Sequence, residues 1–306
     1  MLHITNGDSV LCSFESVSMP GEYLSWRDIL HEGPVPQTET LAELSAIRAR
    51  FVADCGWTSY GEALEELSRR DDVLARSHEQ DEVVLWFEYD LFDQLQLLQV
   101  MDWYHTHRPL PGRLTLIHPE GYLGAMPGEV LNGIFPYRQA VHEQQLELAH
   151  RGWQAFTRPD PAGILQMVTE NATALPYLTA NFLRFLEEYP STHNGLSRSQ
   201  EQILKAIAAG HRDEAEIFAA FCEWEEPVFM GDSTVWQRLR QLADEPAAVR
   251  NDGGYALTDL GRQLLAGEAD WIRACGGIDV WMGGVHLQGS DAAWRWDAGA
   301  KTLRKR

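Results

Sequence analysis

Short apolar runs alternate with amphipathic segments over the first half of the chain, and this alternation is the feature that most constrains the fold. Four runs have the length and composition of β-strands, and they are Leu2–Thr5, Tyr23–Trp26, Val83–Phe87 and Leu114–Ile117. The last two are continuously apolar and are bounded by charged residues, which is typical of parallel strands buried on both faces. The alternation of such strands with helices favours an α/β architecture.

Between these runs, apolar residues recur at intervals of three and four, which places them on one face of a helix. One such stripe consists of Leu41, Leu44, Ile47 and Phe51. A second stripe lies within residues 64–74, and a third follows the third strand over residues 91–102. We therefore expect a doubly wound, mostly parallel, Rossmann-like sheet with packed helices over residues 1–138.

Two further parts follow this domain. Residues 139–194 have the pattern of a helical connection, which prolines divide into separate helices. Residues 195–306 begin with a helix that Ser197 can cap, with Glu201 near the reciprocal capping position. In the tail, two extended stretches predict a hairpin around Gly289-Ser290.

The middle of this last part has a recognisable order of elements. Helix starts at Ser197, Asp213 and Asp232 are followed by a Gly253-Gly254 turn between two short extended pieces, and by a helix after Thr258. Three helices, a hairpin and a closing helix over residues 197–267 resemble a winged helix. The resemblance implies a winged-helix-like α+β domain at the C-terminal end.

The chain is acidic, with a formal net charge of −20. From Ser197 onward, 13 basic and 17 acidic residues give a balance of −4, so residues 1–196 carry −16. Such a field repels polyanions, because nucleic-acid affinity comes largely from neutralised phosphates. Nucleic-acid binding by the N-terminal part is disfavoured, and a small-molecule ligand is the expected partner.

Targeting signals and cysteines indicate the compartment. The start of the chain has no basic stretch followed by an apolar core, and no apolar run approaches the ~18 residues that a membrane span needs. The widely separated cysteines, none of them at metal-ligand spacing, are Cys12, Cys55, Cys222 and Cys275. We expect free, buried thiols in the cytoplasm and no membrane association.

Polar side chains occur where each predicted strand ends, which is where open α/β sheets bind ligands. The first strand runs into an Asn-Gly-Asp-Ser turn, and carboxylates follow the second and third strands. The candidate ligand-binding and catalytic residues at these ends are Thr5, Asn6, Gly7, Asp8, Ser9, Asp28, Glu88, Asp90, Asp93 and His118. If the strands are parallel neighbours, these side chains meet at one edge of the sheet.

Carboxylates at one sheet edge suit Mg²⁺ or another hard divalent cation, which would hold a phosphate- or nucleotide-like ligand. We expect Asp8 and Asp90 as metal ligands, the turn at residues 6–9 as the anion site, and His118 as an acid or base. The alternative without a ligand is that Asp8 and Asp90 cap the helices that follow them. Whether the ligand is chemically transformed stays open.

A second interpretation makes Ser9 a nucleophile. Gly7–Ser9, after a first strand, is similar to the first block of the SGNH hydrolases, which implies an Asp-x-x-His partner. A base and an orienting carboxylate are needed to activate a serine. The pairs that the chain offers are Asp28 with His31, Asp102 with His105, and Asp90 with His118.

A third interpretation is a ligand-responsive regulator that binds DNA or protein through the winged-helix-like part. A recognition helix would present Thr234, Gln237 and Arg238 to a groove. Acidic residues nearly cancel the local positive charge, whereas DNA binding needs a basic face. Protein contact or packing is therefore favoured over DNA contact for this part.

Several blocks together resemble one uncharacterised bacterial family, domain of unknown function 1835. The blocks are His3–Ser9, Trp26–Pro36, Leu85–Leu95, Gly195–Ser197, Phe229–Asp232, Gly283–Leu287 and Trp294–Asp297. The resemblance covers most of the chain, and it implies that the winged-helix-like part belongs to the same unit as the rest. It implies no activity, because the family has no established function.

Overall fold

The computed structural model describes residues 1–170 and 172–305, and the chain divides into two compact units. The N-terminal unit comprises Met1–Thr179 together with Gly283–Val285, and the C-terminal unit comprises Ala180–Met282 and His286–Arg306. The helical connection expected over residues 139–194 therefore falls across the division between the two units.

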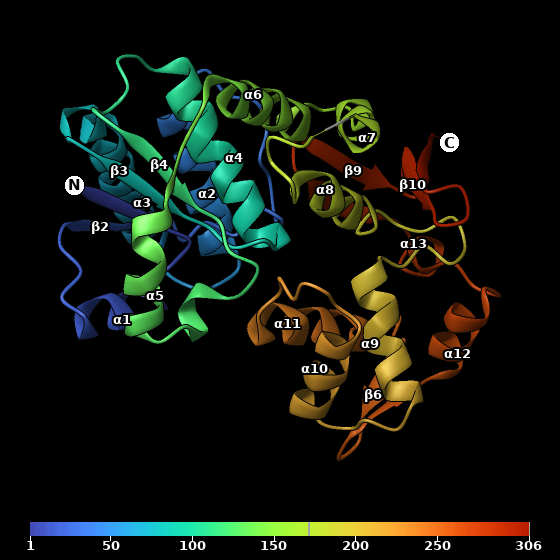
Figure 1. Cartoon of the computed structure of the whole chain (residues 1–306). Helices are drawn as coiled ribbons and strands as arrows, with labels where there is room; N and C mark the ends of the chain where they lie inside the picture. The colour runs from blue at the N-terminus through green and yellow to red at the C-terminus, as the bar shows by residue number, and fades with distance from the viewer. Residues whose placement is uncertain (171, 306) are drawn as a thin grey trace. The chain divides into compact units, whose positions relative to one another are not determined.

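A five-stranded sheet with the strand order β2-β1-β3-β4-β5 forms the centre of the N-terminal unit (Figure 1). Its strands are β1 (Leu2–Thr5), β2 (Glu22–Ser25), β3 (Val83–Trp86), β4 (Leu114–Ile117) and β5 (Gln139–Ala140). The first four are parallel, and β5 is antiparallel to β4. The prediction of a mostly parallel sheet is confirmed, whereas the prediction of helix from residue 139 is wrong for the two residues of β5.

Burial explains why these runs form strands. Every residue of β1, β3 and β4 is buried, including the polar His3, Thr5 and Thr115, whereas β2 lies at the sheet edge and buries only Leu24. The register aligns Thr5 with both Ser25 and Trp86, and Trp86 with Ile117. The four parallel strands therefore end at the same level.

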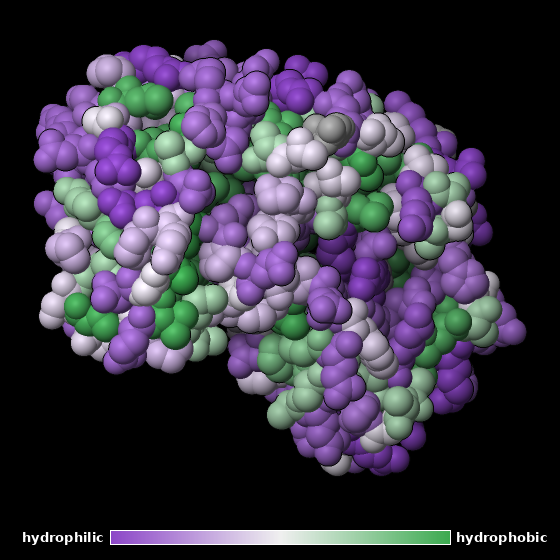
Figure 2. All heavy atoms as spheres, in the orientation of Figure 1, coloured by the Kyte–Doolittle hydropathy of each residue, from purple (hydrophilic) through white to green (hydrophobic). Residues whose placement is uncertain are grey.

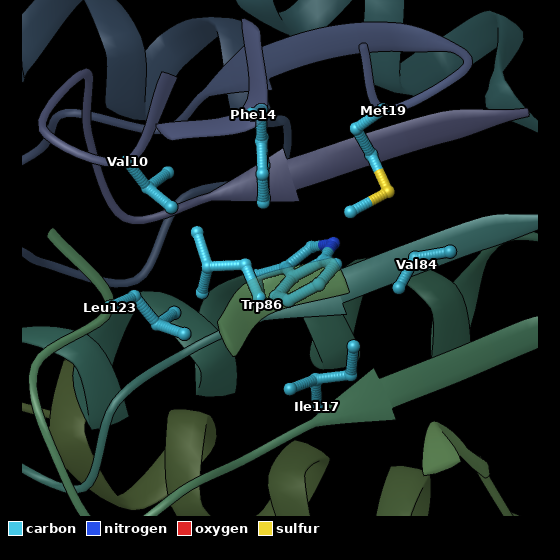
Figure 3. Close-up of a cluster of buried hydrophobic side chains, with 8 residues drawn as sticks. Val10, Phe14, Met19, Val84, Trp86, Ile117 and Leu123 are labelled. Carbon is cyan, nitrogen blue, oxygen red and sulfur yellow. The ribbon is translucent and has the colours of Figure 1, made fainter. Parts of the chain in front are cut away.

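Helices cover both faces of the sheet. On one face, α1 (Leu11–Ser16) and α5 (Gly128–Ile134) pack over Val84 and Trp86 (Figure 3). The crossovers from β2 to β3 and from β3 to β4 run across the sheet in the direction opposite to the crossover from β1 to β2. Because such crossovers are right-handed, the helices within them lie on the face opposite to α1. Those helices are α2 (Leu41–Asp54), α3 (Tyr60–Arg76) and α4 (Leu91–Thr106).

Two more helices extend this layer of the N-terminal unit. The helix α6 (Glu143–Thr157) packs on α4, and α7 (Ala162–Thr169) packs on α6. Because α4 has neighbours on several sides, most of its residues are buried, including the polar Asp93, Gln94 and Gln99. Three short 3₁₀ turns complete the unit at Ser77–Glu79, Leu123–Ala125 and Phe135–Tyr137.

The C-terminal unit contains helices and small antiparallel sheets. Its helices are α8 (Leu178–Leu186, of which two residues belong to the N-terminal unit), α9 (Arg198–Ala208), α10 (Glu214–Glu223), α11 (Asp232–Ala243), α12 (Asp259–Ala266) and α13 (Trp271–Ala274). Between α11 and α12, β6 (Val249–Asn251) pairs with β7 (Tyr255–Leu257). Ser197 caps α9, but its reciprocal partner is Gln200 and not Glu201, because Gln200 occupies the third helical position.

The tail forms two hairpins instead of the expected one. The strand β9 (Val285–Gly289) pairs with β8 (Ile278–Met282), and β10 (Trp294–Asp297) pairs with β11 (Thr302–Lys305). The prediction of a hairpin around Gly289-Ser290 is therefore wrong. The turn before β9 lies at Gly283, whose φ of 60° is accessible to glycine at little cost.

The visible surface of each unit is mostly hydrophilic, with small separate hydrophobic patches (Figure 2). No helix in the described residues is long and apolar enough to cross a membrane. All four cysteines are free, as predicted. The prediction that they are buried is wrong for Cys12 and Cys275, which are exposed; in α1 the inward position is occupied by Phe14.

Candidate functional site

The centre of the sheet brings two strand ends together. From β1 the chain crosses to β2 in one direction, and from β3 it crosses to β4 in the opposite direction. The topological switch point, where the direction of the crossovers reverses, therefore lies between β1 and β3. Ligands bind open α/β sheets in the crevice outside the strand ends at this point. Asn6 directly follows β1, and Glu88, Asp90 and Asp93 follow β3.

Three carboxylates meet there. Glu88, Asp90 and Asp93 each contribute one carboxylate oxygen to a group in which all three oxygens lie within 4.8 Å of one another. Their side chains are buried, with exposed fractions of 5%, 3% and 0%. We call these three residues and Asn6 the acidic cluster. Acidic side chains are rarely buried without partners of opposite charge, so this cluster needs a physical explanation.

Helix α4 explains why two of the carboxylates point inward. Asp90 is the N-cap of α4, and its Oδ1 accepts a hydrogen bond of 3.1 Å from the backbone nitrogen of Asp93. Asp93 lies in the first turn, where the helix dipole favours a negative charge. The capping interpretation is thus confirmed for Asp90, and a cap and a ligand site are compatible at a helix N-terminus.

Hydrogen bonds fix the remaining members. Asp93 Oδ1 accepts from the backbone nitrogen of Glu88 at 2.6 Å, and Asp93 Oδ2 accepts from Asn6 Nδ2 at 2.9 Å. The backbone nitrogen of Leu123 donates to Glu88 Oε1 at 2.6 Å. The cluster therefore joins segments that follow β1, β3 and β4, and the Asn6–Asp93 bond spans 87 residues of sequence.

The electrostatics of the cluster are those of crowded, buried negative charges. Burial raises the pKa of Glu88, and burial with repulsion from Glu88 raises the pKa of Asp90 to about 7. Burial and both neighbouring carboxylates raise the pKa of Asp93 well above its usual range. In the described part of the chain, no lysine or arginine forms an ion pair with any of the three.

Asn6 supplies a further oxygen to this environment. Its side chain is 7% exposed, its Nδ2 donates to Asp93, and its Oδ1 is buried without a hydrogen-bond partner. A buried acceptor that lacks a partner costs free energy, so its retention calls for an explanation. Three carboxylates and an amide oxygen are the oxygen ligands that hard divalent cations prefer, and the donor set fits such an ion.

His118 lies beside the cluster and is joined to it through Gln94. Gln94 Nε2 donates to the backbone oxygen of Glu88 at 2.7 Å and lies 2.6 Å from His118 Nε2. Because Gln94 Nε2 is a donor, His118 Nε2 accepts, and the neutral ring carries its proton on Nδ1. Burial lowers the pKa of His118 to about 4, which keeps the imidazole neutral at physiological pH. The ring of Tyr177 packs edge-on against it, with centroids 4.6 Å apart.

Sequence reasoning overlooked Gln94 and the backbone nitrogen of Leu123. The signal for Gln94 was present, because it follows Asp90 by four residues and so lies one helical turn further on the same face. Leu123 gave no signal, because only the loop after β4 brings its backbone to Glu88.

The structure does not bring Asp8 into the cluster. Its side chain is 53% exposed and pairs with Arg27 at 2.6 Å. The expectation that Asp8 and Asp90 bind a metal together is therefore wrong for Asp8. Asp8 does not cap α1 either, because the cap position is Val10 and lacks a side-chain hydrogen bond. The turn that begins at Asn6 carries Asp8 outward, while Thr5 Oγ1 donates to the backbone oxygen of Gly7.

Ser9 is exposed and lies against Gly124, where an added Cβ would come within 2.5 Å of Ser9 Oγ. Among the described residues, no hydrogen bond joins its hydroxyl to His118 or to another histidine. The three carboxylates expected to orient a catalytic histidine, Asp28, Asp90 and Asp102, have other partners.

Asp28 is buried and pairs with Arg48 at 2.9 Å, so it stabilises the fold beside β2 and does not join the cluster. Asp102 contacts His150 at 2.6 Å rather than His105. The Asp-x-x-His pairs predicted from spacing therefore do not meet Ser9.

The residues expected on a recognition helix lie on α11. Thr234 is 4% exposed, Arg238 pairs with Glu188 at 3.2 Å, and Gln237 is partly buried. The expectation that Thr234 and Arg238 face a groove is wrong. Thr234 is buried within the C-terminal unit, and Arg238 is held there by its ion pair with Glu188.

No protein-family model matches the chain, and no curated protein matches it at a significant level. The resemblance to domain of unknown function 1835 therefore stays a prediction.

Proposed function

We propose that the acidic cluster binds a divalent cation and that the cation holds a small phosphorylated or nucleotide-like ligand at the strand ends of β1 and β3. The observation that carries the proposal is the combination of three buried carboxylates without a cationic partner and the unpartnered Oδ1 of Asn6. A bound cation would balance the three carboxylates at once, and Asn6, which contacts Asp93, lies beside it.

Each residue has a definite part in this proposal. Glu88, Asp90 and Asp93 would bind the cation, with the amide oxygen of Asn6 as a neutral ligand. Mg²⁺ in proteins commonly keeps one or two carboxylates and completes its shell with water and substrate phosphates, and there it stabilises charge on phosphoryl oxygens. The expected acid–base role of His118 is not part of this proposal, because its Nε2 already accepts from Gln94 and its Nδ1 carries the proton; His118 would instead hold Gln94 against the backbone of Glu88.

A matched pair of variants tests the site. In Asp90→Asn, the side-chain oxygen can still cap α4 and the new amide nitrogen can donate to Glu88, so the fold is preserved while one ligand charge is lost. Asp8→Asn makes the same change at the exposed end of the neighbouring strand. Mg²⁺ or Mn²⁺ at about 100 times the dissociation constant should stabilise the wild type by about 2.7 kcal/mol. For a domain of this size that is a rise in melting temperature of roughly 5–10 °C.

We expect the shift in the wild type and in Asp8→Asn and its loss in Asp90→Asn. Addition of ATP or a sugar phosphate with Mg²⁺ should raise the melting temperature further, whereas the phosphate without the cation should not. No shift with Mg²⁺, Mn²⁺ or Ca²⁺ would overturn the proposal, as would a shift that Asp90→Asn retains.

A second candidate function rests on the C-terminal unit. We propose that residues 197–267 form a winged-helix-like module, because α9, α10, α11, the β6–β7 hairpin and α12 follow one another in that order. The burial of Thr234 and the pairing of Arg238 favour a protein partner over DNA. A gel shift against genomic fragments at low salt tests this: retention that Arg240→Glu, a substitution at an exposed position of α11, abolishes would restore the DNA interpretation.

A further inference from the structure

Three tyrosines gather beside the acidic cluster in the N-terminal unit. The ring centroids of Tyr89 and Tyr122 are 5.8 Å apart, and those of Tyr89 and Tyr177 are 5.9 Å apart. The rings come from three separate segments: Tyr89 follows β3, Tyr122 lies in the loop after β4, and Tyr177 directly precedes α8. We call these three residues the tyrosine group.

The backbone joins the tyrosine group to the acidic cluster. Tyr89 stands between Glu88 and Asp90 in the chain. Tyr122 directly precedes Leu123, whose backbone nitrogen donates to Glu88 Oε1 at 2.6 Å. The third ring packs on the histidine that a glutamine of α4 joins to the cluster. Because consecutive Cα atoms are about 3.8 Å apart, the side chains of Tyr89 and Tyr122 begin within one residue of the groups that form the proposed cation site.

The tyrosine group keeps aromatic surface in contact with solvent. Tyr122 is 37% exposed, and Tyr89 and Tyr177 are half-buried. The ring planes of Tyr89 and Tyr122 are inclined by 50°, and those of Tyr89 and Tyr177 by 67°. In such contacts the edge of one ring meets the face of another, whereas a parallel stack would cover two faces. The contacts within the group therefore do not use up its ring faces, and Tyr122 offers the largest surface to a planar ligand.

Two neighbouring surfaces thus suit two different parts of one ligand. A divalent cation at the acidic cluster would bind phosphate oxygens, and exposed aromatic side chains stack the planar bases of nucleotides. A sugar phosphate uses the first surface, whereas a nucleotide uses both. We propose that the ligand of the acidic cluster is a nucleotide whose base stacks on the tyrosine group, with Tyr122 as the main stacking surface. This inference rests on the proposed function, because the cation holds the phosphate.

The test compares ligands that differ only in the base. AMP, GMP, CMP, UMP and D-ribose 5-phosphate are each titrated into the full chain in saturating Mg²⁺ and followed by calorimetry. The preferred nucleotide should bind about tenfold more tightly than ribose 5-phosphate, which is the order of magnitude that stacking on one aromatic ring supplies. Tyr122→Ala should remove most of this preference by weakening the nucleotide, because ribose 5-phosphate has no base to stack.

Tyr137→Ala is the matched control, because Tyr137 is 76% exposed in the same unit but lies outside the tyrosine group. It should keep the preference of the wild type. Equal weakening of both ligands in Tyr122→Ala would show that this ring serves the fold and not the base, and would overturn the inference. A preference that Tyr122→Ala retains would overturn it as well.

The melting temperature in Mg²⁺ alone, measured before any nucleotide is added, separates this inference from the proposed function. If Mg²⁺ stabilises the wild type but none of the four nucleotides binds more tightly than ribose 5-phosphate, the inference is overturned and the cation site stands. If no divalent cation stabilises the wild type, the proposed function is overturned and the inference falls with it.

Discussion

Glu188 in the C-terminal unit and Asp93 in the N-terminal unit are both completely or almost completely buried, but their surroundings are opposite. Glu188 pairs with Arg184 at 2.7 Å and with Arg238 at 3.2 Å, and Arg184 also pairs with Glu225 at 2.6 Å. Despite burial, these arginines lower the pKa of Glu188 to about 2. Asp93 meets two more carboxylates and an amide, and its pKa is raised.

The difference separates a structural role from a binding role. A buried carboxylate that is paired with arginines needs no further partner, so it is complete within the fold. Removing one partner leaves the other as an uncompensated buried charge, which destabilises the folded state. A buried group of carboxylates without cations is incomplete, so it holds protons or binds a cation from solution. The N-terminal unit contains both kinds, since its Asp28–Arg48 pair is as complete as the Glu188 network.

Breaking the complete network should have the largest effect. Arg184→Met leaves Glu188 and Glu225 buried with less positive charge, and we expect a loss of about 3–5 kcal/mol in the free energy of unfolding. Urea denaturation measures it. Arg262→Met, which breaks an exposed pair with Asp259, is the control and should change little. Equal effects of the two variants would contradict the distinction.

The two groups should also respond to pH in opposite directions. Glu188 has a folded pKa of about 2, below the 4.5 of an unperturbed glutamate, so its stabilisation is present above pH 4.5 and is lost as the pH falls. That contribution is on the order of 3 kcal/mol. Asp90 has a folded pKa of about 7, above the usual 3.8, so in metal-free buffer stability should fall as the pH rises between these values.

Urea midpoints at several pH values separate these contributions. Glu188→Gln should flatten the acid side of the profile, and Asp90→Asn should flatten the decline toward neutral pH. A saturating divalent cation should remove that decline in the wild type, because the cation replaces the protons. A stability that rises steadily toward neutral pH without metal would contradict the account of the acidic cluster.

Relief of repulsion within the cluster should be a smaller effect. In metal-free buffer at about pH 8, Asp90→Asn removes one buried negative charge and provides a donor for Glu88, so we expect it to be at least as stable as the wild type, by up to ~1 kcal/mol. Ligand sites are often stabilised by substitutions that remove function. A clear destabilisation at that pH would show that the carboxylate serves the fold alone.

The smallest effect is expected at Ser9. Ser9→Ala changes an exposed side chain that belongs neither to the acidic cluster nor to the Glu188 network. The free energy of unfolding should therefore change by less than ~0.5 kcal/mol, and the response to Mg²⁺ should be unchanged. A fluorophosphonate probe should leave Ser9 unlabelled. Labelling that disappears in Ser9→Ala would revive the hydrolase interpretation.

Local physical chemistry made much of the architecture predictable from the sequence alone. Apolar runs bounded by charge predicted β3 and β4, because strands buried on both faces are largely apolar. Asp90, directly before an apolar helix, was recognisable as a possible N-cap. Ser197, Asp213 and Thr258 marked helix starts for the same reason, since each side chain satisfies a backbone nitrogen within three residues.

Tertiary structure alone decided which of those local features meet. The strand order puts β1 beside β3, which joins Asn6 to Asp93 and leaves Asp8 on the surface; residues separated by 87 positions have no local signal of contact. Packing likewise decided that Thr234 is buried and that β9 pairs with β8. Hydrogen bonding within a helix or a cap is local, whereas strand pairing and burial depend on the whole chain, and for that reason the sequence indicated the strand ends but only the fold selected the acidic cluster among them.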